Sequence, residues 1–128
     1  MLLGVWALLR RLFAPARELE RELARLVLPL SRGETLALAW ISALAEELFF
    51  RGALQGAVGL LPAAILFALL HFGPGRAFRV WGLFAFAAGL LLGALAAGRE
   101  SIGAAIVAHA LTNGINLARL ARKERESA

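Results

Sequence analysis

The sequence predicts an all-α protein, a polytopic bundle of about four transmembrane helices with an N-terminal interfacial helix ahead of them. Three observations lead to this fold class. Hydrophobic residues make up 60% of the 128 residues, charged residues only 18%, and the mean hydropathy is +0.73, whereas soluble domains are nearer half apolar and a quarter charged. Four apolar stretches follow one another along the chain. The chain also has 13 glycines in largely helical sequence, which agrees with close helix packing in lipid.

The N-terminal region, residues 1–33, is typical of an amphipathic segment at the membrane interface. Its first apolar run is shorter than the roughly 20 residues that cross a bilayer. Arg10 and Arg11 follow that run, whereas the positive charge of a signal peptide precedes it. Residues 17–25 mix both charges at helical spacing, so we expect them to continue along the surface.

A core of residues 34–120 comes next, followed by a basic cytoplasmic tail of residues 121–128. The predicted spans cover about residues 35–58, 60–72, 80–97 and 102–120. Pro62 suits the first turn of the second helix, and Gly73-Pro74-Gly75 is a strong stop after it. Ser101 is the expected N-cap of the fourth helix.

The distribution of basic residues predicts the topology. Arginines precede the first span, separate the second from the third and recur in the tail. The positive-inside rule then places both termini in the cytoplasm, in a multi-pass protein of the inner (plasma) membrane. The net charge is +5, and arginine supplies nearly all of the positive charge. Such a charge suits contact with anionic lipid headgroups. Nucleic acid is not an expected partner, because the arginines flank apolar segments and are not interleaved with surface aromatics.

Two adjacent glutamates lie well inside the first span. A charge at mid-bilayer costs about 2.5–3.5 kcal/mol on insertion scales, so two adjacent glutamates at this depth are not incidental. Glu47 and Arg51 share a helix face four residues apart and can form a buried ion pair that only fixes packing. Glu46 has no basic residue at i+3 or i+4. An unpaired carboxylate in a low-dielectric setting suits general acid–base catalysis, and this is the function expected for Glu46.

The two histidines of the chain both fall in apolar helices. His71 ends the second span, and His109 lies in the fourth with Asn113 one turn later. A rise of about 1.5 Å per residue places Glu46 and His109 at about the same depth, with Asn113 and His71 nearer the same surface. The sequence therefore predicts that these groups line one cavity in one half of the bilayer.

These residues resemble the motifs of the CPBP family, which contains CAAX prenyl proteases and bacteriocin-processing enzymes. The segment Glu46–Gly52, EELFFRG, is similar to the family's EExxxR motif. Phe67–His71 is similar to FxxxH, and His109–Asn113 is similar to HxxxN. Each motif alone is weak, but three in order on apolar helices form a specific pattern. The resemblance covers about residues 34–117.

The resemblance implies an intramembrane endopeptidase of CAAX type. Glu46 and His71 would activate a water for attack on the peptide carbonyl, and His109 and Asn113 would stabilise the oxyanion. Glu47 and Arg51 would orient or charge-tune the site. Glu46, His71 and His109 could also hold a catalytic zinc, so the choice between no cofactor and a divalent metal stays open. We favour the metal-free reading slightly, because a His beside an Asn suits an oxyanion hole.

Three function classes follow from these residues. The first is a bacterial endopeptidase acting on membrane-associated or lipid-modified peptides or proteins, with a homo-oligomer as one way to complete its core. The second is a non-catalytic family member that binds a peptide, as an immunity protein or a membrane scaffold. The third is a small ion or proton transporter that uses the same polar residues.

Overall fold

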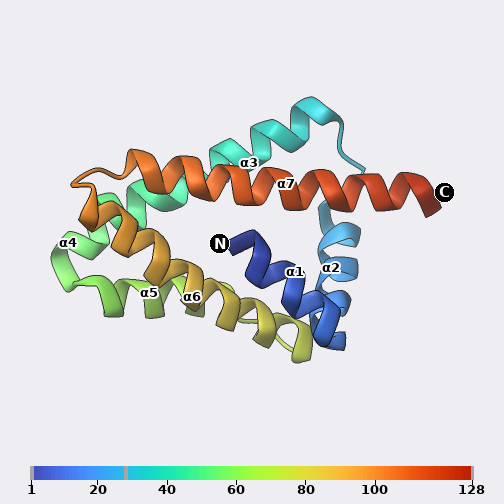
Figure 1. The fold of residues 1–128 in the computed structure, drawn as a ribbon, viewed down its shortest axis with the longest axis horizontal. Helices are drawn as coiled ribbons and strands as arrows, with labels where there is room; N and C mark the ends of the chain where they lie inside the picture. The colour runs from blue at the N-terminus through green and yellow to red at the C-terminus, as the bar shows by residue number, and fades with distance from the viewer. Residues whose placement is uncertain (1, 28, 128) are drawn as a thin grey trace.

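The computed structural model describes residues 2–27 and 29–127, and every regular element in these two ranges is helical (Figure 1). The prediction of an all-α protein is confirmed. Met1, Leu28 and Ala128, which belong to the predicted N-terminal segment and tail, lie outside the described residues. The elements are α1 (Leu2–Leu12), α2 (Ala14–Val27), α3 (Arg32–Glu47), the π-helix η1 (Leu48–Leu54), α4 (Gln55–Val58), α5 (Leu60–Leu69), α6 (Arg76–Gly98) and α7 (Gly103–Ser127).

The four predicted spans correspond to helical stretches with shifted ends. The first is one uninterrupted helix made of α3, η1 and α4. The second, α5, ends at Leu69, before the predicted limit, and the third, α6, begins at Arg76. The fourth, α7, runs on to Ser127, so the basic tail continues the last helix.

Local signals explain where these helices begin. Ser31 and Glu34 form a capping box at the start of α3, with the Glu34 N–H donating to the Ser31 hydroxyl and the Ser31 N–H donating to the Glu34 carboxylate. The Ser101 hydroxyl accepts a bond from the Gly103 N–H, which satisfies one of the orphan donors at the start of α7.

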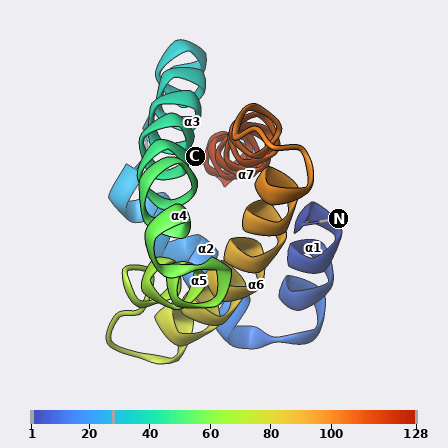
Figure 2. The same ribbon diagram turned by 90° about the vertical axis from the view of Figure 1, so that its left-hand side faces the viewer.

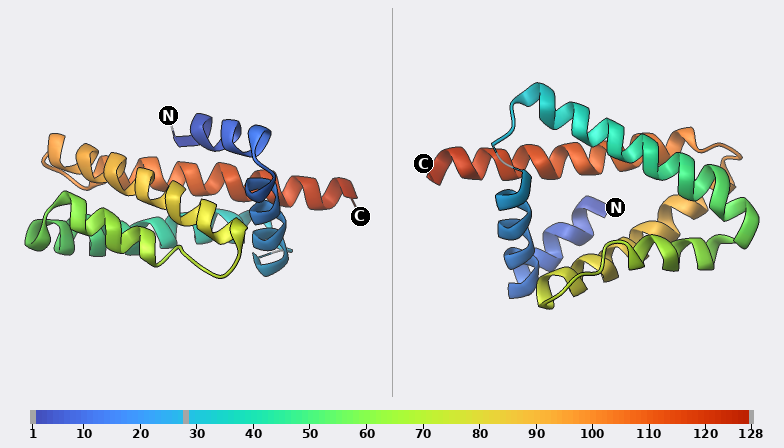
Figure 3. Two further views of the ribbon diagram at one scale, coloured as in Figure 1. Left: turned by 90° about the horizontal axis from the view of Figure 1, so that it is seen from below. Right: turned by 180° about the vertical axis from the view of Figure 1, so that it is seen from behind.

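The bundle consists of two antiparallel pairs joined at one end. α3 packs along α7, and α5 packs along α6 (Figures 1 and 2). Gly59, with a φ of +89°, makes the turn from α4 into α5, a conformation that glycine adopts without strain. At the other end α2 runs across the bundle, and it contacts both α6 and α7 (Figure 3).

The N-terminal helices are part of the packed structure. Trp6, Ala16 and Leu19 form a buried cluster with Ala77 of α6. Glu20 is also buried, and it accepts bonds from Trp6, Arg119 and Lys123. One face of the segment 17–25 is therefore covered by protein, while its contact with the membrane interface stays a prediction.

Glycines let α6 approach its neighbours closely. A Cβ atom at Gly89 would lie 3.2 Å from the Cα of Ala64 in α5. The carbonyl of Gly89 accepts a bond from Arg51, and that of Gly93, one turn later, accepts one from Gln55. The small residues spaced along α6 thus let side chains of the first helical stretch reach its backbone carbonyls.

Among the helices described, α6 alone combines the length and the hydropathy of a membrane span, and α5 is apolar but only 10 residues long. One such helix agrees with membrane insertion, although the core helix of a soluble protein can have the same properties. The prediction of four spans is therefore not confirmed by length and hydropathy.

We predict that Gly89→Leu destabilises the protein, because the new side chain meets the backbone of α5. Overpacking of this kind costs about 1–3 kcal/mol, which thermal unfolding followed by circular dichroism in detergent would detect as a lower midpoint. The matched control is Gly56→Ala, since a Cβ at Gly56 meets nothing within 4 Å. Equal midpoints for the two variants would contradict the proposed close approach.

Candidate active site

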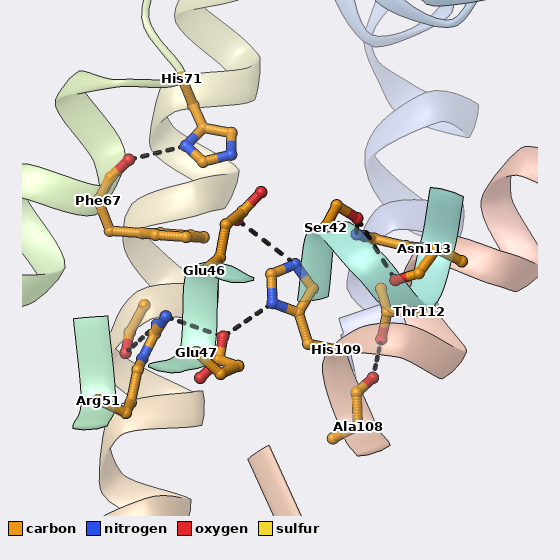
Figure 4. A network of polar contacts seen from close by, with 12 residues as sticks. Ser42, Glu46, Glu47, Arg51, Phe67, His71, Ala108, His109, Thr112 and Asn113 are labelled. Carbon is orange, nitrogen blue, oxygen red and sulfur yellow. Dashed lines mark hydrogen bonds and ion pairs between the residues drawn. The ribbon is translucent and has the colours of Figure 1, made fainter. Parts of the chain in front are cut away.

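A cavity of about 340 Å³ lies between the two helix pairs and the N-terminal helices. Four of the six predicted site residues line it: Glu46, His71, His109 and Asn113. Figure 4 shows the Glu46 carboxylate pointing toward the side on which both imidazoles lie. The structure thus brings together residues that the chain separates by up to 67 positions. The roles assigned to them from the resemblance stay predictions.

The other two predicted residues, Glu47 and Arg51, lie behind the cavity wall. The side chain of Glu47 is 0% exposed, and that of Arg51 is 2% exposed. Arg51 donates to the Glu47 carboxylate at 2.9 Å, so the predicted i, i+4 ion pair is confirmed. The guanidinium also donates to the Gly89 carbonyl and lies 4.6 Å from the ring centroid of Phe67. Charge, hydrogen bonds and a cation–π contact together compensate its burial.

Glu47 has a second partner that the sequence did not predict. Its Oε1 atom lies 2.8 Å from Nδ1 of His109. A carboxylate only accepts hydrogen bonds, so Nδ1 carries the proton and donates. Nε2 of His109 then faces the cavity, 3.8 Å from Oε2 of Glu46. Glu47 therefore fixes the orientation of the His109 ring and determines that Nε2 is the ring nitrogen that faces the cavity.

Glu46 and Glu47 each have an Oε2 atom that is buried without a hydrogen bond, but Glu47 is also bonded through Oε1 to Arg51 and His109. The Oε2 atom of Glu46 lies 3.8 Å from Nε2 of His109, which exceeds hydrogen-bonding distance. Buried polar atoms are usually paired, and an orphan of this kind is a common property of functional sites.

His71 lies in the turn after α5, and it is held by the residue that begins its own motif. Its Nδ1 donates to the carbonyl of Phe67 at 2.7 Å, one of the carbonyls left unpaired at a helix C-terminus. The ring packs against Phe67 in a tilted contact and against Trp81 edge to face, at centroid distances of 4.5 and 5.1 Å. With Nδ1 protonated, the remaining nitrogen, Nε2, is a proton acceptor.

Asn113 is positioned by Ser42, a residue that the sequence reasoning missed. The Asn113 amide donates to the Ser42 hydroxyl at 3.2 Å. This uses one of its two N–H bonds, and the other stays available to the cavity. Ser42 lies one turn before Glu46 on the same face of an apolar helix, a position that could have identified it.

A π-helix begins directly after the two glutamates. Within it the backbone bonds span five residues, and the Gln55 N–H donates to the Phe50 carbonyl at its end. Such segments are rare and often occur at functional sites. No sequence pattern that we considered predicted this one.

Among the side chains described, no three of His, Cys, Asp and Glu come together as the ligands of a metal ion would. Glu46, His71 and His109 share a cavity, but in this structure they are not grouped as the three ligands of one zinc ion. We therefore derive no step through a metal.

An all-helical bundle with Glu, His and Asn side chains on one cavity has the groups needed for hydrolysis. The family model described as Type II CAAX prenyl endopeptidase Rce1-like matches residues 29–115, which include all six predicted site residues. The chain therefore belongs to the Rce1-like family of type II CAAX prenyl endopeptidases, membrane-embedded proteases, as the resemblance implied. No curated protein and no solved structure matches the chain.

The two glutamates should differ sharply in their effect on stability. Glu47→Gln leaves the charge of Arg51 buried without its anion, and breaking such a pair costs about 3–5 kcal/mol. Glu46→Gln changes a group without a hydrogen-bond partner on Oε2, so we expect a change of less than about 1 kcal/mol. Thermal unfolding of both variants in the same detergent measures the difference. A larger loss for Glu46→Gln would contradict the division of roles described above.

Proposed function

We propose that this chain is an intramembrane endopeptidase that hydrolyses peptide bonds of membrane-associated or lipid-modified substrates. One observation carries the proposal. Glu46, with an unpartnered carboxylate oxygen, shares a cavity with two imidazoles and a carboxamide. A pure binding protein has no need for an unpaired acid in this position.

In the proposed reaction Glu46 and His71 act as the general base. Glu46 can accept a proton on Oε2. His71 can accept one on Nε2, because its own Nδ1 donates to the Phe67 carbonyl. The oxygen of the water attacks the peptide carbonyl carbon while its proton passes to one of these groups. The same proton then goes to the leaving amine as the carbon–nitrogen bond breaks.

His109 and Asn113 are the proposed stabilisers of the oxyanion. The second N–H of the Asn113 amide is one donor. A doubly protonated His109 would donate from Nε2 while Nδ1 stays bonded to Glu47. Donors fixed before the reaction stabilise developing charge without reorganisation, and each contributes about 2.7–4 kcal/mol in known oxyanion holes.

The surface of the bundle supports the proposal that four helical stretches cross the membrane. Large hydrophobic side chains on the first, second, third and fourth stretches are exposed, among them Ile41, Leu69, Leu83 and Leu111. Glu47 and His109 are buried, and Glu46 and His71 line the internal cavity. The first stretch, residues 32–58, is about 40 Å long, enough to cross a bilayer. α5 is shorter and would be shielded by α6. Both termini would then lie in the cytoplasm.

We predict that Glu46→Gln and His71→Ala each lower the rate of peptide cleavage about 10²–10⁴-fold, the usual contribution of general acid–base catalysis. The assay uses purified protein in liposomes with a panel of membrane-anchored peptides, including prenylated and unmodified forms. The control is Glu18→Gln, an exposed glutamate of α2, which should match the wild type. Equal rates for wild type and Glu46→Gln would remove the catalytic assignment. Peptide binding without turnover by the wild type would indicate a binding protein instead.

We also predict that cleavage survives thorough chelation. The measurement is activity after dialysis against a zinc chelator, together with elemental analysis of the purified protein. Activity that disappears with the chelator and returns with added zinc would replace the metal-free mechanism.

A further inference from the structure

One wall of the cavity that contains Glu46 is formed by the N-terminal helix α1. Leu2 and Trp6, one turn apart on this helix, line the cavity. α6 and α7 diverge from the turn that joins them, and α1 lies between them in Figure 1. The view from below places α1 on one side of both helix pairs (Figure 3). Val5 and Leu8, on another face of α1, are exposed, so this helix separates the cavity from the surroundings on that side.

α1 is less deeply embedded than the neighbouring helix α2. Of the residues that the structure describes in α1, only Trp6 is buried, with its ring centroid 5.1 Å from that of Phe84 in α6. In α2, Ala16 and Leu19 are both 0% exposed, and this helix packs on α6 and α7. α2 is therefore fixed to the bundle, while α1 is attached to it by a few side chains.

The joint between α1 and α2 is the single residue Phe13. Pro15 has no N–H group and its ring disfavours a continuing helix, which accounts for the break. The carbonyls of Arg10 and Arg11, near the end of α1, accept bonds from the side chain of Arg17 in α2. These bonds keep the C-terminal end of α1 beside α2. A change of backbone dihedral angles at the joint can thus swing the rest of α1 while α2 stays in place.

Contacts with one carboxylate, that of Glu20 in α2, keep α1 over the cavity. The indole N–H of Trp6 donates to Oε1 of Glu20 at 3.3 Å, and Nε of Arg10 lies 3.8 Å from the same oxygen. Arg119 and Lys123 of α7 donate to this carboxylate at 2.7 and 2.9 Å. If α1 moves away, Glu20 keeps these two cations. Opening therefore leaves no buried carboxylate unpaired, which is the main cost of breaking a buried ion pair.

The size of the cavity gives a reason for α1 to move. Its volume of about 340 Å³ is near the lower end of the range for small-molecule sites. A peptide of five residues is about 17 Å long when extended, and its side chains also need space. A peptide substrate therefore requires that one wall move away. α1 takes no part in the Glu47 network that connects the other helices, so its movement leaves the core intact.

We propose that α1 is a lid over the cavity, hinged at Phe13 and held closed by a latch, the contacts of Trp6 and Arg10 with Glu20. In the open form Trp6 and Arg10 move to the membrane interface, an environment that suits the amphipathic side chains of tryptophan and arginine. The inference rests on the proposed function for the nature of the molecule that enters, and its test does not depend on turnover.

The test uses the absence of cysteine from the chain. Ala88→Cys, the cavity reporter, places one thiol on the cavity wall. Ala63→Cys, the core reporter, places one at a position of α5 that is 3% exposed. The rate of modification by N-ethylmaleimide in a neutral detergent, followed by mass spectrometry, measures how often each thiol becomes accessible. Glu18→Cys, at an exposed position of α2, gives the rate of an accessible thiol, and we expect the cavity reporter to react at least about tenfold more slowly.

Removal of the latch should open the cavity selectively. Trp6→Phe combined with Arg10→Gln removes both contacts with Glu20 but keeps an aromatic ring beside Phe84. We expect this latch variant to raise the rate at the cavity reporter about tenfold, which corresponds to about 1.4 kcal/mol, the order of one hydrogen bond. The rate at the core reporter should stay unchanged.

The matched control makes the same two chemical changes at exposed positions. It combines Trp40→Phe on α3, where the side chain is 47% exposed, with Arg11→Gln, next to the latch residue Arg10. Neither reporter should respond to this control. If the latch variant fails to fold, Trp6→Phe alone takes its place.

Three outcomes would overturn the lid. The first is a cavity reporter that reacts as fast as the exposed thiol with the latch intact, because the cavity would then already be open. The second is an equal effect of the latch variant and its control. The third is a faster reaction at both reporters, which would indicate general loosening of the bundle. A protein that cleaves no peptide but shows the expected pattern would refute the protease and leave the lid standing.

Discussion

The buried carboxylate of Glu47 is the interaction on which the rest of the core depends. It accepts bonds from Arg51 on its own helical stretch and from His109 on α7. Arg51 in turn bonds to the backbone of α6 and lies over an aromatic ring of α5. One negative charge therefore connects all four helical stretches of the core. In a low-dielectric interior such a charge is stable only if its partners stay in place, so the requirement for pairing also fixes the geometry of the bundle.

The distribution of polar groups follows from the same constraint. Glu47, Arg51 and His109 are buried between the helices, and many large apolar side chains are exposed along the length of the helices. In the proposed membrane-spanning bundle, lipid would offer no hydrophobic drive for helices to associate, so close packing and internal polar contacts would have to supply it. The Gly89 and Gly93 carbonyls, which accept bonds from Arg51 and Gln55, combine both contributions. The groups that would perform the chemistry are thus embedded in the contacts that hold the helices together.

Much of this arrangement could be predicted from the sequence, because it depends on local spacing. The helices, the Glu47–Arg51 pair and the meeting of Glu46, His71, His109 and Asn113 on one cavity follow from apolar periodicity and depth. The contacts of Ser42 with Asn113 and of His109 with Glu47 depend on how two helices are rotated against each other. The spacing of residues along the chain does not determine that rotation. Glu20 was missed for another reason. In a segment of mixed charge, nothing distinguishes a buried glutamate from its exposed neighbours.

The π-helix η1 divides the first helical stretch into two parts whose side chains face different neighbours. In a regular α-helix each residue turns the chain by about 100°, so faces set at one end continue to the other. A π-helical segment needs more residues for each turn, and it resets the angular phase between the parts that flank it. Glu46 can therefore face the cavity while Arg51 and Gln55, beyond the transition, both reach the backbone of α6. The two parts of one continuous helix can in this way contact different neighbours, and the insertion or loss of a single residue there would rotate one part by about 100° relative to the other.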